Sequence, residues 1–148
     1  MTAPKPENER AADSKKLRVV IFDPTDRLAH PYGHLAHISS RLAIIMRTVS
    51  TTKLRQMEVR DARSRQDFVI LADALGAEHK RPWALSIPPI KDDAGLPIPL
   101  TGTLLFIGQD KETGKFTDYP LSFVEHKTML YHDAVRVRKA KAKEENRK

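Results

Sequence analysis

Residues 17–22 have the sequence Leu-Arg-Val-Val-Ile-Phe, and Asp23-Pro24 follows them directly. Short runs of aliphatic, β-branched and aromatic residues that end at a turn signal are typical of buried strands. Pro24 disfavours helical geometry at the residue before it, so this run should not continue as a helix. We therefore predict that a buried strand over residues 17–22 opens the folded domain.

The segment before this strand, residues 1–16, is rich in Pro, Glu, Lys and Ala and contains Met1 as its one large apolar residue. Such a composition does not bury enough apolar surface to offset the entropy lost on ordering. We expect residues 1–16 to be a flexible N-terminal arm and residues 139–148 to be a basic C-terminal tail. Residues 17–138 then form a single domain, which fits the usual size of roughly 100–200 residues.

After the strand, the spacing of apolar residues changes to steps of three and four, which is typical of one face of a helix. This pattern predicts a first helix over residues 33–49, with Leu35, Ile38, Leu42, Ile45 and Val49 on its buried stripe. Ser50-Thr51-Thr52 can cap a second helix that begins at Lys53 and ends at Leu75, just before Gly76.

Five prolines between residues 82 and 99 exclude a regular helix or a central strand there, so residues 81–100 are predicted to be an extended connector. Residues 103–107 and 117–123 predict a β-hairpin around a loop at 109–115. From His126 the periodicity favours a basic C-terminal helix, with a strand through residues 134–138 as the lesser alternative. This order of elements predicts a small single α+β domain with a buried N-terminal strand, two helices, a Pro-rich connector, a β-hairpin and a C-terminal basic helix.

The composition narrows the function classes. The 148 residues contain no cysteine, which excludes disulfide scaffolds, thiolate zinc sites and cysteine nucleophiles and slightly favours a cytoplasmic location. No run approaches the roughly 18–20 consecutive apolar residues that a membrane-spanning helix needs, and the N-terminus lacks the hydrophobic core of an export signal. We therefore expect a cytoplasmic protein with no membrane partner.

The formal net charge of +7 is concentrated in two blocks. Residues 33–66 contain seven basic and two acidic residues, and residues 127–148 contain eight basic and three acidic ones. If both blocks lie on one face of the folded protein, they attract phosphate. Our leading prediction is a non-enzymatic accessory protein that binds DNA or RNA non-specifically. The candidate contacts are Arg47, Lys53, Arg55, Arg60, Arg63, Arg65, Arg136, Arg138, Lys139, Lys141 and Lys143.

The apolar connector supports a different function class. Trp83, Leu85 and Ile87 can dock against a protein partner, because extended Pro-rich segments lose little entropy on binding and Trp often anchors interfaces. The alternative prediction is therefore a structural or adaptor subunit of a larger assembly, or a homo-oligomer.

A cluster of histidines is the remaining chemical motif. On a helix His34 and His37 share a face, and with His30 or Asp26 they can offer imidazole and carboxylate groups to a metal ion. The chain lacks HExxH, GxSxG and a complete phosphate-binding loop, so we predict no enzyme activity and no cofactor. Metal is not among the predicted ligands, although the histidine cluster leaves that question open.

Overall fold

The computed structural model describes residues 16–26, 28–49, 51, 53–74, 91–92, 102–132 and 135–142, with only the backbone considered at 91–92 and 135–142. The strands are β1 (Lys16–Phe22), β2 (His34–Ser39), β3 (Leu54–Asp61), β4 (Asp67–Asp73), β5 (Lys91–Asp92), β6 (Leu104–Gln109), β7 (Phe116–Thr117) and β8 (Val135–Ala142). The helices are the short 3-10 turn η1 (Pro24–Asp26), α2 (Leu42–Val49) and α3 (Phe123–Tyr131).

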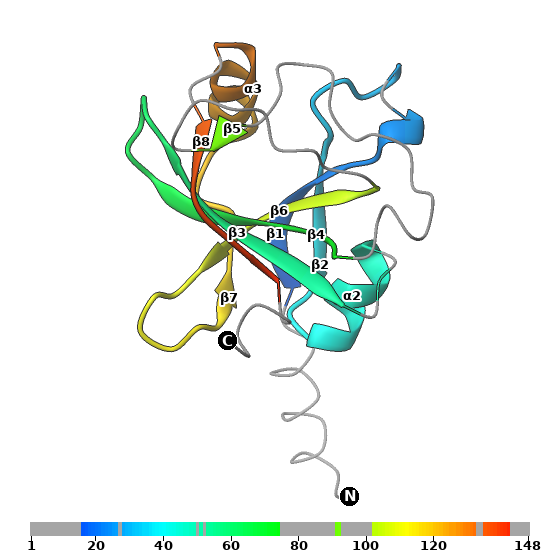
Figure 1. Cartoon of the computed structure of the whole chain (residues 1–148). Helices are drawn as coiled ribbons and strands as arrows, with labels where there is room; N and C mark the ends of the chain where they lie inside the picture. The colour runs from blue at the N-terminus through cyan, green and yellow to red at the C-terminus, as the bar shows by residue number, and fades with distance from the viewer. Residues whose placement is uncertain are drawn as a thin grey trace, which may run out of the picture.

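These strands form one twisted sheet, in which the order is β2-β1-β6-β4-β3-β8-β5 and β7 pairs with β6 (Figure 1). The pairings are antiparallel except for the parallel pair of β5 and β8. Within the described residues, the domain is therefore a mixed α+β structure, mostly an antiparallel sheet with two α-helices. None of the described helices has the length and apolar character needed to cross a membrane.

Both faces of the sheet are buried at its centre, because successive side chains of a strand point to opposite faces. On β4, Phe68 and Ile70 belong to one core cluster, while Val69 and Leu71 belong to the other. The first cluster includes residues of α3, and the second includes residues of α2. We call these two sides of the sheet the α3 face and the α2 face.

Helix α3 is fixed by its first turn and by a buried histidine. Ser122 caps the helix by accepting a hydrogen bond from the Glu125 amide, and the Glu125 carboxylate accepts one from the Ser122 amide. His126 is fully buried, with Nε2 2.8 Å from the carbonyl oxygen of Tyr32 and Nδ1 2.8 Å from the hydroxyl of Tyr119. Because a carbonyl can only accept, Nε2 carries the proton and Nδ1 accepts from Tyr119.

The first predicted helix is wrong over its N-terminal half. Residues 34–39 form β2, which pairs with β1, and the helix begins only at Leu42. Ala36 and Ile38 pack against the core of the α2 face, whereas Leu35 is 42% exposed. Leu35 and Ile38 therefore lie on opposite faces of a strand, and their three-residue spacing was not a helical stripe.

The second predicted helix is also wrong, because residues 54–73 form the hairpin of β3 and β4. Asp61 closes the turn: its buried carboxylate accepts hydrogen bonds from the amides of Arg63 and Ser64 and from the Ser64 hydroxyl. Arg65 adopts a left-handed conformation with φ of 64°. Strands β6 and β8 pair with the outer edges of this hairpin, so tertiary pairing stabilises the extended conformation.

The predicted basic C-terminal helix is correct over residues 126–131 and wrong over the basic segment that follows. Helix α3 ends at Tyr131, and the basic segment after it forms β8. This strand includes residues 135–138 of the alternative strand that we predicted, and it continues to Ala142. Residues 139–142, which we assigned to the tail, are therefore part of the sheet because β3 offers them backbone partners. The N-terminal arm up to residue 15 and the connector apart from residues 91–92 lie outside the described residues.

Candidate nucleic-acid interface

Strand β3 lies between β4 and β8 and contributes polar side chains to the α2 face. Met57 and Val59 are buried in the core on the α3 face, so the alternating residues Gln56, Glu58 and Arg60 belong to the α2 face. Helix α2 packs on the apolar part of the α2 face, where Leu54 begins β3. The rest of β3 therefore continues that face as a polar surface.

The register between β3 and β8 brings the two basic blocks of the sequence together. Arg136 is the partner of Arg60, Lys139 is the partner of Glu58, and Lys141 is the partner of Gln56. Residues opposite one another in antiparallel strands share a face of the sheet, so these three basic positions belong to the α2 face. The register shifts between Glu58 and Val59, and Arg138 is the residue without a partner there.

Asp67 at the start of β4 binds two basic side chains. Its carboxylate accepts two hydrogen bonds from the Arg60 guanidinium, at 2.7 and 3.1 Å, and one from Lys111 Nζ at 2.6 Å. The hydrogen bond from Arg60 is the largest cause that lowers the pKa of Asp67 well below its usual range, and Lys111 lowers it further against the opposing effect of burial. Asp67 in turn raises the pKa of Arg60. Two cations therefore share one carboxylate.

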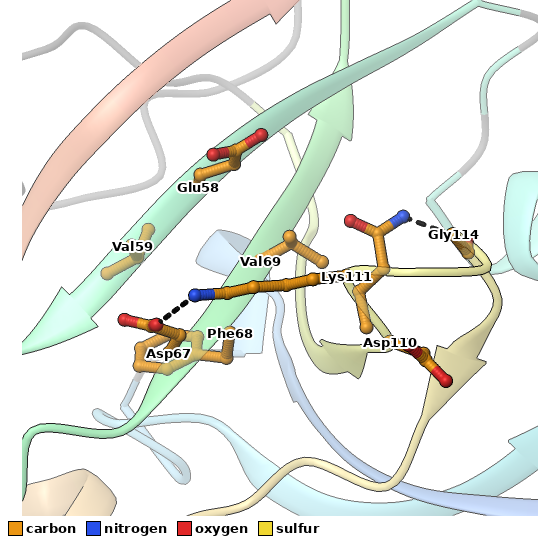
Figure 2. Close-up of a pocket in the computed structure, with 9 residues that line it drawn as sticks. Glu58, Val59, Asp67, Phe68, Val69, Asp110, Lys111 and Gly114 are labelled. Atoms are coloured by element: carbon orange, nitrogen blue, oxygen red, sulfur yellow. Dashed lines mark hydrogen bonds and ion pairs between the residues drawn. The ribbon is translucent and has the colours of Figure 1, made fainter.

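The loop between β6 and β7 holds Lys111 in place. The side chain of Gln109 donates a hydrogen bond to the carbonyl of Gly114 at 3.0 Å. It also accepts one from the side-chain amide of Gln56 at 2.9 Å. Asp110 accepts from amides of its own loop, and Figure 2 shows its carboxylate directed away from Glu58 and Asp67. The loop is thus attached to β3 and supported internally.

A pocket of about 300 Å³ opens between this loop and the hairpin. Lys111 extends across it toward Asp67, while Glu58 lies on the neighbouring strand (Figure 2). Val69 contributes an apolar side chain, whereas Phe68 is only 3% exposed and presents almost none of its ring. We call five basic positions on β3, on β8 and in the loop between β6 and β7 the basic face: Arg60, Lys111, Arg136, Lys139 and Lys141.

The other predicted nucleic-acid contacts are distributed over separate elements. Arg63 and Arg65 are exposed in the turn after β3, close in sequence to Arg60. Arg55 is on the α3 face, because it is an odd-numbered residue of β3 like Met57. Arg47 lies in the last turn of α2 and Lys53 precedes β3. Lys143 and the predicted protein-docking residues Trp83, Leu85 and Ile87 lie outside the described residues.

The structure also corrects the geometry of the histidine cluster. His34 and His37 are on a strand, where residues three apart lie on opposite faces, so they do not form the pair that a helix would give. Asp26, His30 and His34 do come together, each with a ligand atom within 4.8 Å of the others. This cluster belongs to the turn between β1 and β2, whereas the basic face is near the other end of the sheet order.

Sequence reasoning missed Lys111, Asp67 and Gln109 as parts of the site. Lys111 and Asp67 are 44 residues apart, and their contact depends on the pairing of β4 with β6. The only sequence signal was the hairpin predicted around residues 109–115, which put Lys111 at an exposed turn. Once residues 54–73 are known to be a hairpin, alternation along β3 identifies Arg60 as a residue of the α2 face.

Comparisons with protein-family models, with curated proteins and with solved structures find no match to this chain. The functional argument therefore depends on the chemistry of the site itself.

Proposed function

We propose that this protein binds nucleic acid non-specifically, by contacting phosphate groups with the basic face. The observation that carries the proposal is the antiparallel pairing of β3 with β8, with Arg136 opposite Arg60 and Lys139 opposite Glu58. This pairing supports convergence of two basic blocks that are far apart in the sequence. A surface that concentrates cations in this way attracts polyanions and increases their rate of association.

The arrangement around Asp67 supports phosphate binding as well. Arg60 presents its guanidinium as a fixed fork on Asp67, and Lys111 is 69% exposed beside it. Arg60 and Lys111 together exceed by one the negative charge of the carboxylate that they share, while Glu58 and Asp110 also line the pocket. A phosphate can then accept a hydrogen bond from Lys111 with little loss of conformational entropy, because the loop that carries Lys111 is already held in place.

The character of the pocket favours contact with the phosphate backbone over recognition of bases. Single-strand binding proteins stack bases on exposed aromatic rings, and Phe68 is too deeply buried to serve in that way. Phosphate contacts fix position without reading sequence. We therefore propose binding to DNA or RNA without sequence preference, by a non-enzymatic cytoplasmic protein.

The alternative role as a structural or adaptor subunit depends on Trp83, Leu85 and Ile87. These residues lie outside the described ranges, so that role stays a prediction. Light scattering of the purified chain distinguishes the two roles. A monomer that binds nucleic acid favours our proposal, whereas stable self-association or a co-purifying protein without nucleic-acid binding favours the alternative.

The direct test is fluorescence anisotropy with labelled mixed-sequence duplex DNA, single-stranded DNA and RNA at several salt concentrations. We expect the logarithm of the binding constant to fall linearly with the logarithm of salt, with a slope of about 0.9 for each duplex phosphate that is neutralised. Binding of similar strength to unrelated sequences is expected. An affinity that does not depend on salt would refute phosphate neutralisation.

A matched pair of variants tests which surface of the protein contacts the nucleic acid. Lys139→Gln with Lys141→Gln removes two charges from the basic face, and Lys16→Gln with Lys127→Gln removes two exposed charges from β1 and α3. The first variant should weaken binding and reduce the salt slope by about two, while the second should bind almost as the unchanged protein does. Equal weakening in both variants would show that only net charge matters and would contradict the proposed face.

A further inference from the structure

We infer that Asp26, His30 and His34 form a binding site for a divalent transition-metal ion such as Zn²⁺ or Co²⁺. The three side chains each offer a ligand atom, and these atoms all lie within 4.8 Å of one another. The site comprises the end of η1, the following turn and the first residue of β2. It is independent of the proposed nucleic-acid binding.

The donor set determines which ions fit. Two imidazoles and one carboxylate suit zinc, cobalt, nickel, copper or iron, whereas Mg²⁺ and Ca²⁺ prefer sites made of oxygen atoms alone. Three protein ligands leave at least one coordination position for water in a tetrahedral zinc complex. This pattern is typical of open metal sites, since structural zinc sites usually have four protein ligands.

Metal binding requires only small changes in the distances between these ligand atoms. Ligand atoms of a tetrahedral zinc ion with bonds of about 2.0–2.1 Å lie about 3.4 Å apart. His30 Nδ1 and Asp26 Oδ2 are 2.8 Å apart and have to separate slightly, while the rings of His30 and His34 are 5.3 Å apart between centroids. His30 and Asp26 are about half exposed, at 48% and 46%, so rotation of their side chains can close the remaining distance.

The backbone holds the cluster near this geometry. The amide of His30 donates to the carbonyl of Asp26, and the amide of Gly33 donates to the carbonyl of His30, both at 3.0 Å. Gly33 has φ of 89°, and a Cβ atom there would lie 2.7 Å from the carbonyl oxygen of Ile21. Only glycine fits this approach, which fastens the turn to the end of β1 just before His34.

The metal also has a clear entry route, since the His30 and Asp26 side chains reach solvent. His30 donates its Nδ1 hydrogen to the Asp26 carboxylate at 2.8 Å, and a cation bound between the two groups would replace that hydrogen. His37 supplies a control within the same strand. It is exposed, lies three residues after His34 and pairs with Arg18, on the opposite face of the sheet.

The experiment uses the full chain without a histidine tag, treated with a chelator and then titrated with Co²⁺ and with Zn²⁺. The visible absorption of bound Co²⁺ reports its coordination, and calorimetry with Zn²⁺ gives the stoichiometry. We expect one ion per chain. His30→Ala and His34→Ala should each weaken binding by at least about tenfold, while His37→Ala should leave the affinity within about twofold.

Circular dichroism of each variant separates loss of the site from loss of the fold, and Asp26→Asn provides a second variant that removes a ligand charge while preserving size. Absence of saturable Co²⁺ or Zn²⁺ binding to the unchanged protein would overturn the inference. So would equal weakening by His34→Ala and His37→Ala, because that result indicates scattered surface histidines. Loss confined to the three ligand variants supports the site whatever the outcome of the nucleic-acid experiments.

Discussion

Acidification should destabilise this protein through one buried side chain, His126. Burial is the main cause that lowers its pKa from 6.5 to about 4, partly offset by the hydrogen bond to Tyr32. In the folded protein Nδ1 accepts from the Tyr119 hydroxyl, so a second ring proton would face another donor in a site without exposure to solvent. Phe106 contacts the imidazole ring of His126 edge-to-face, and Phe123 stacks on the same ring, with centroid distances of 4.7 and 5.8 Å.

The direction and size of the effect follow from the two pKa values. Between pH 6.5 and pH 4 the unfolded chain binds a proton at His126 that the folded protein does not, so the free energy of unfolding falls as the pH falls. At about 1.4 kcal/mol for each pKa unit, the loss approaches about 3 kcal/mol at pH 4. It should amount to about 1.4 kcal/mol at pH 5.5, and above pH 6.5 this contribution to stability is fully present.

The assay is urea unfolding at pH values between 7.5 and 4.5, in the unchanged protein and in His126→Gln. Glutamine keeps an amide donor for Tyr32 and an oxygen acceptor for Tyr119 but does not titrate. We expect the variant to be less stable at every pH, so the informative quantity is the difference between the two pH profiles. If both proteins lose stability in parallel between pH 6.5 and pH 4.5, the reasoning about His126 is refuted.

Two further predictions concern the basic face and the turn before β2. Asp67→Asn should strengthen nucleic-acid binding several-fold and steepen its salt dependence, because Arg60 and Lys111 lose the carboxylate that they share. Fluorescence anisotropy at two salt concentrations measures this change. Unchanged or weaker binding would contradict the prediction. Gly33→Ala should lower the free energy of unfolding by about 1–3 kcal/mol more than Gly114→Ala in urea titrations. Both glycines have positive φ, but only the first would place a Cβ atom against a backbone oxygen of β1, so equal losses would exclude that contact as the cause.

The α+β class could be predicted from the sequence, but the errors in the three predicted helices could not be corrected without tertiary information. In β4, Phe68 and Leu71 lie on opposite faces of the sheet, although their three-residue spacing imitates a helical step. The turn between β3 and β4 contains no Gly, Pro or Asn. Asp61 supplies the turn chemistry through its carboxylate, a signal that is weak when read alone.

The candidate sites show the same division between local and long-range information. The turn that joins Asp26, His30 and His34 is local, and three of the residues weighed as possible ligands do meet there. The contact between Lys111 and Asp67 depends instead on strand pairing across 44 residues. Local sequence therefore indicated the histidine cluster, whereas only the sheet register could identify Lys111 and exclude Arg55 from the basic face.

The basic blocks form strands, and this geometry determines which of their side chains share a face of the sheet. A basic block has the same net charge as a helix or as a strand, so its attraction to phosphate can be anticipated without the correct secondary structure. The period of the element decides which members of the block act together. With a period of two, Arg60 shares its face with Arg136 and Lys139 but not with Arg55. The proposed phosphate contact therefore depends on paired strands, and it requires the β3–β8 register to be kept when the ligand binds.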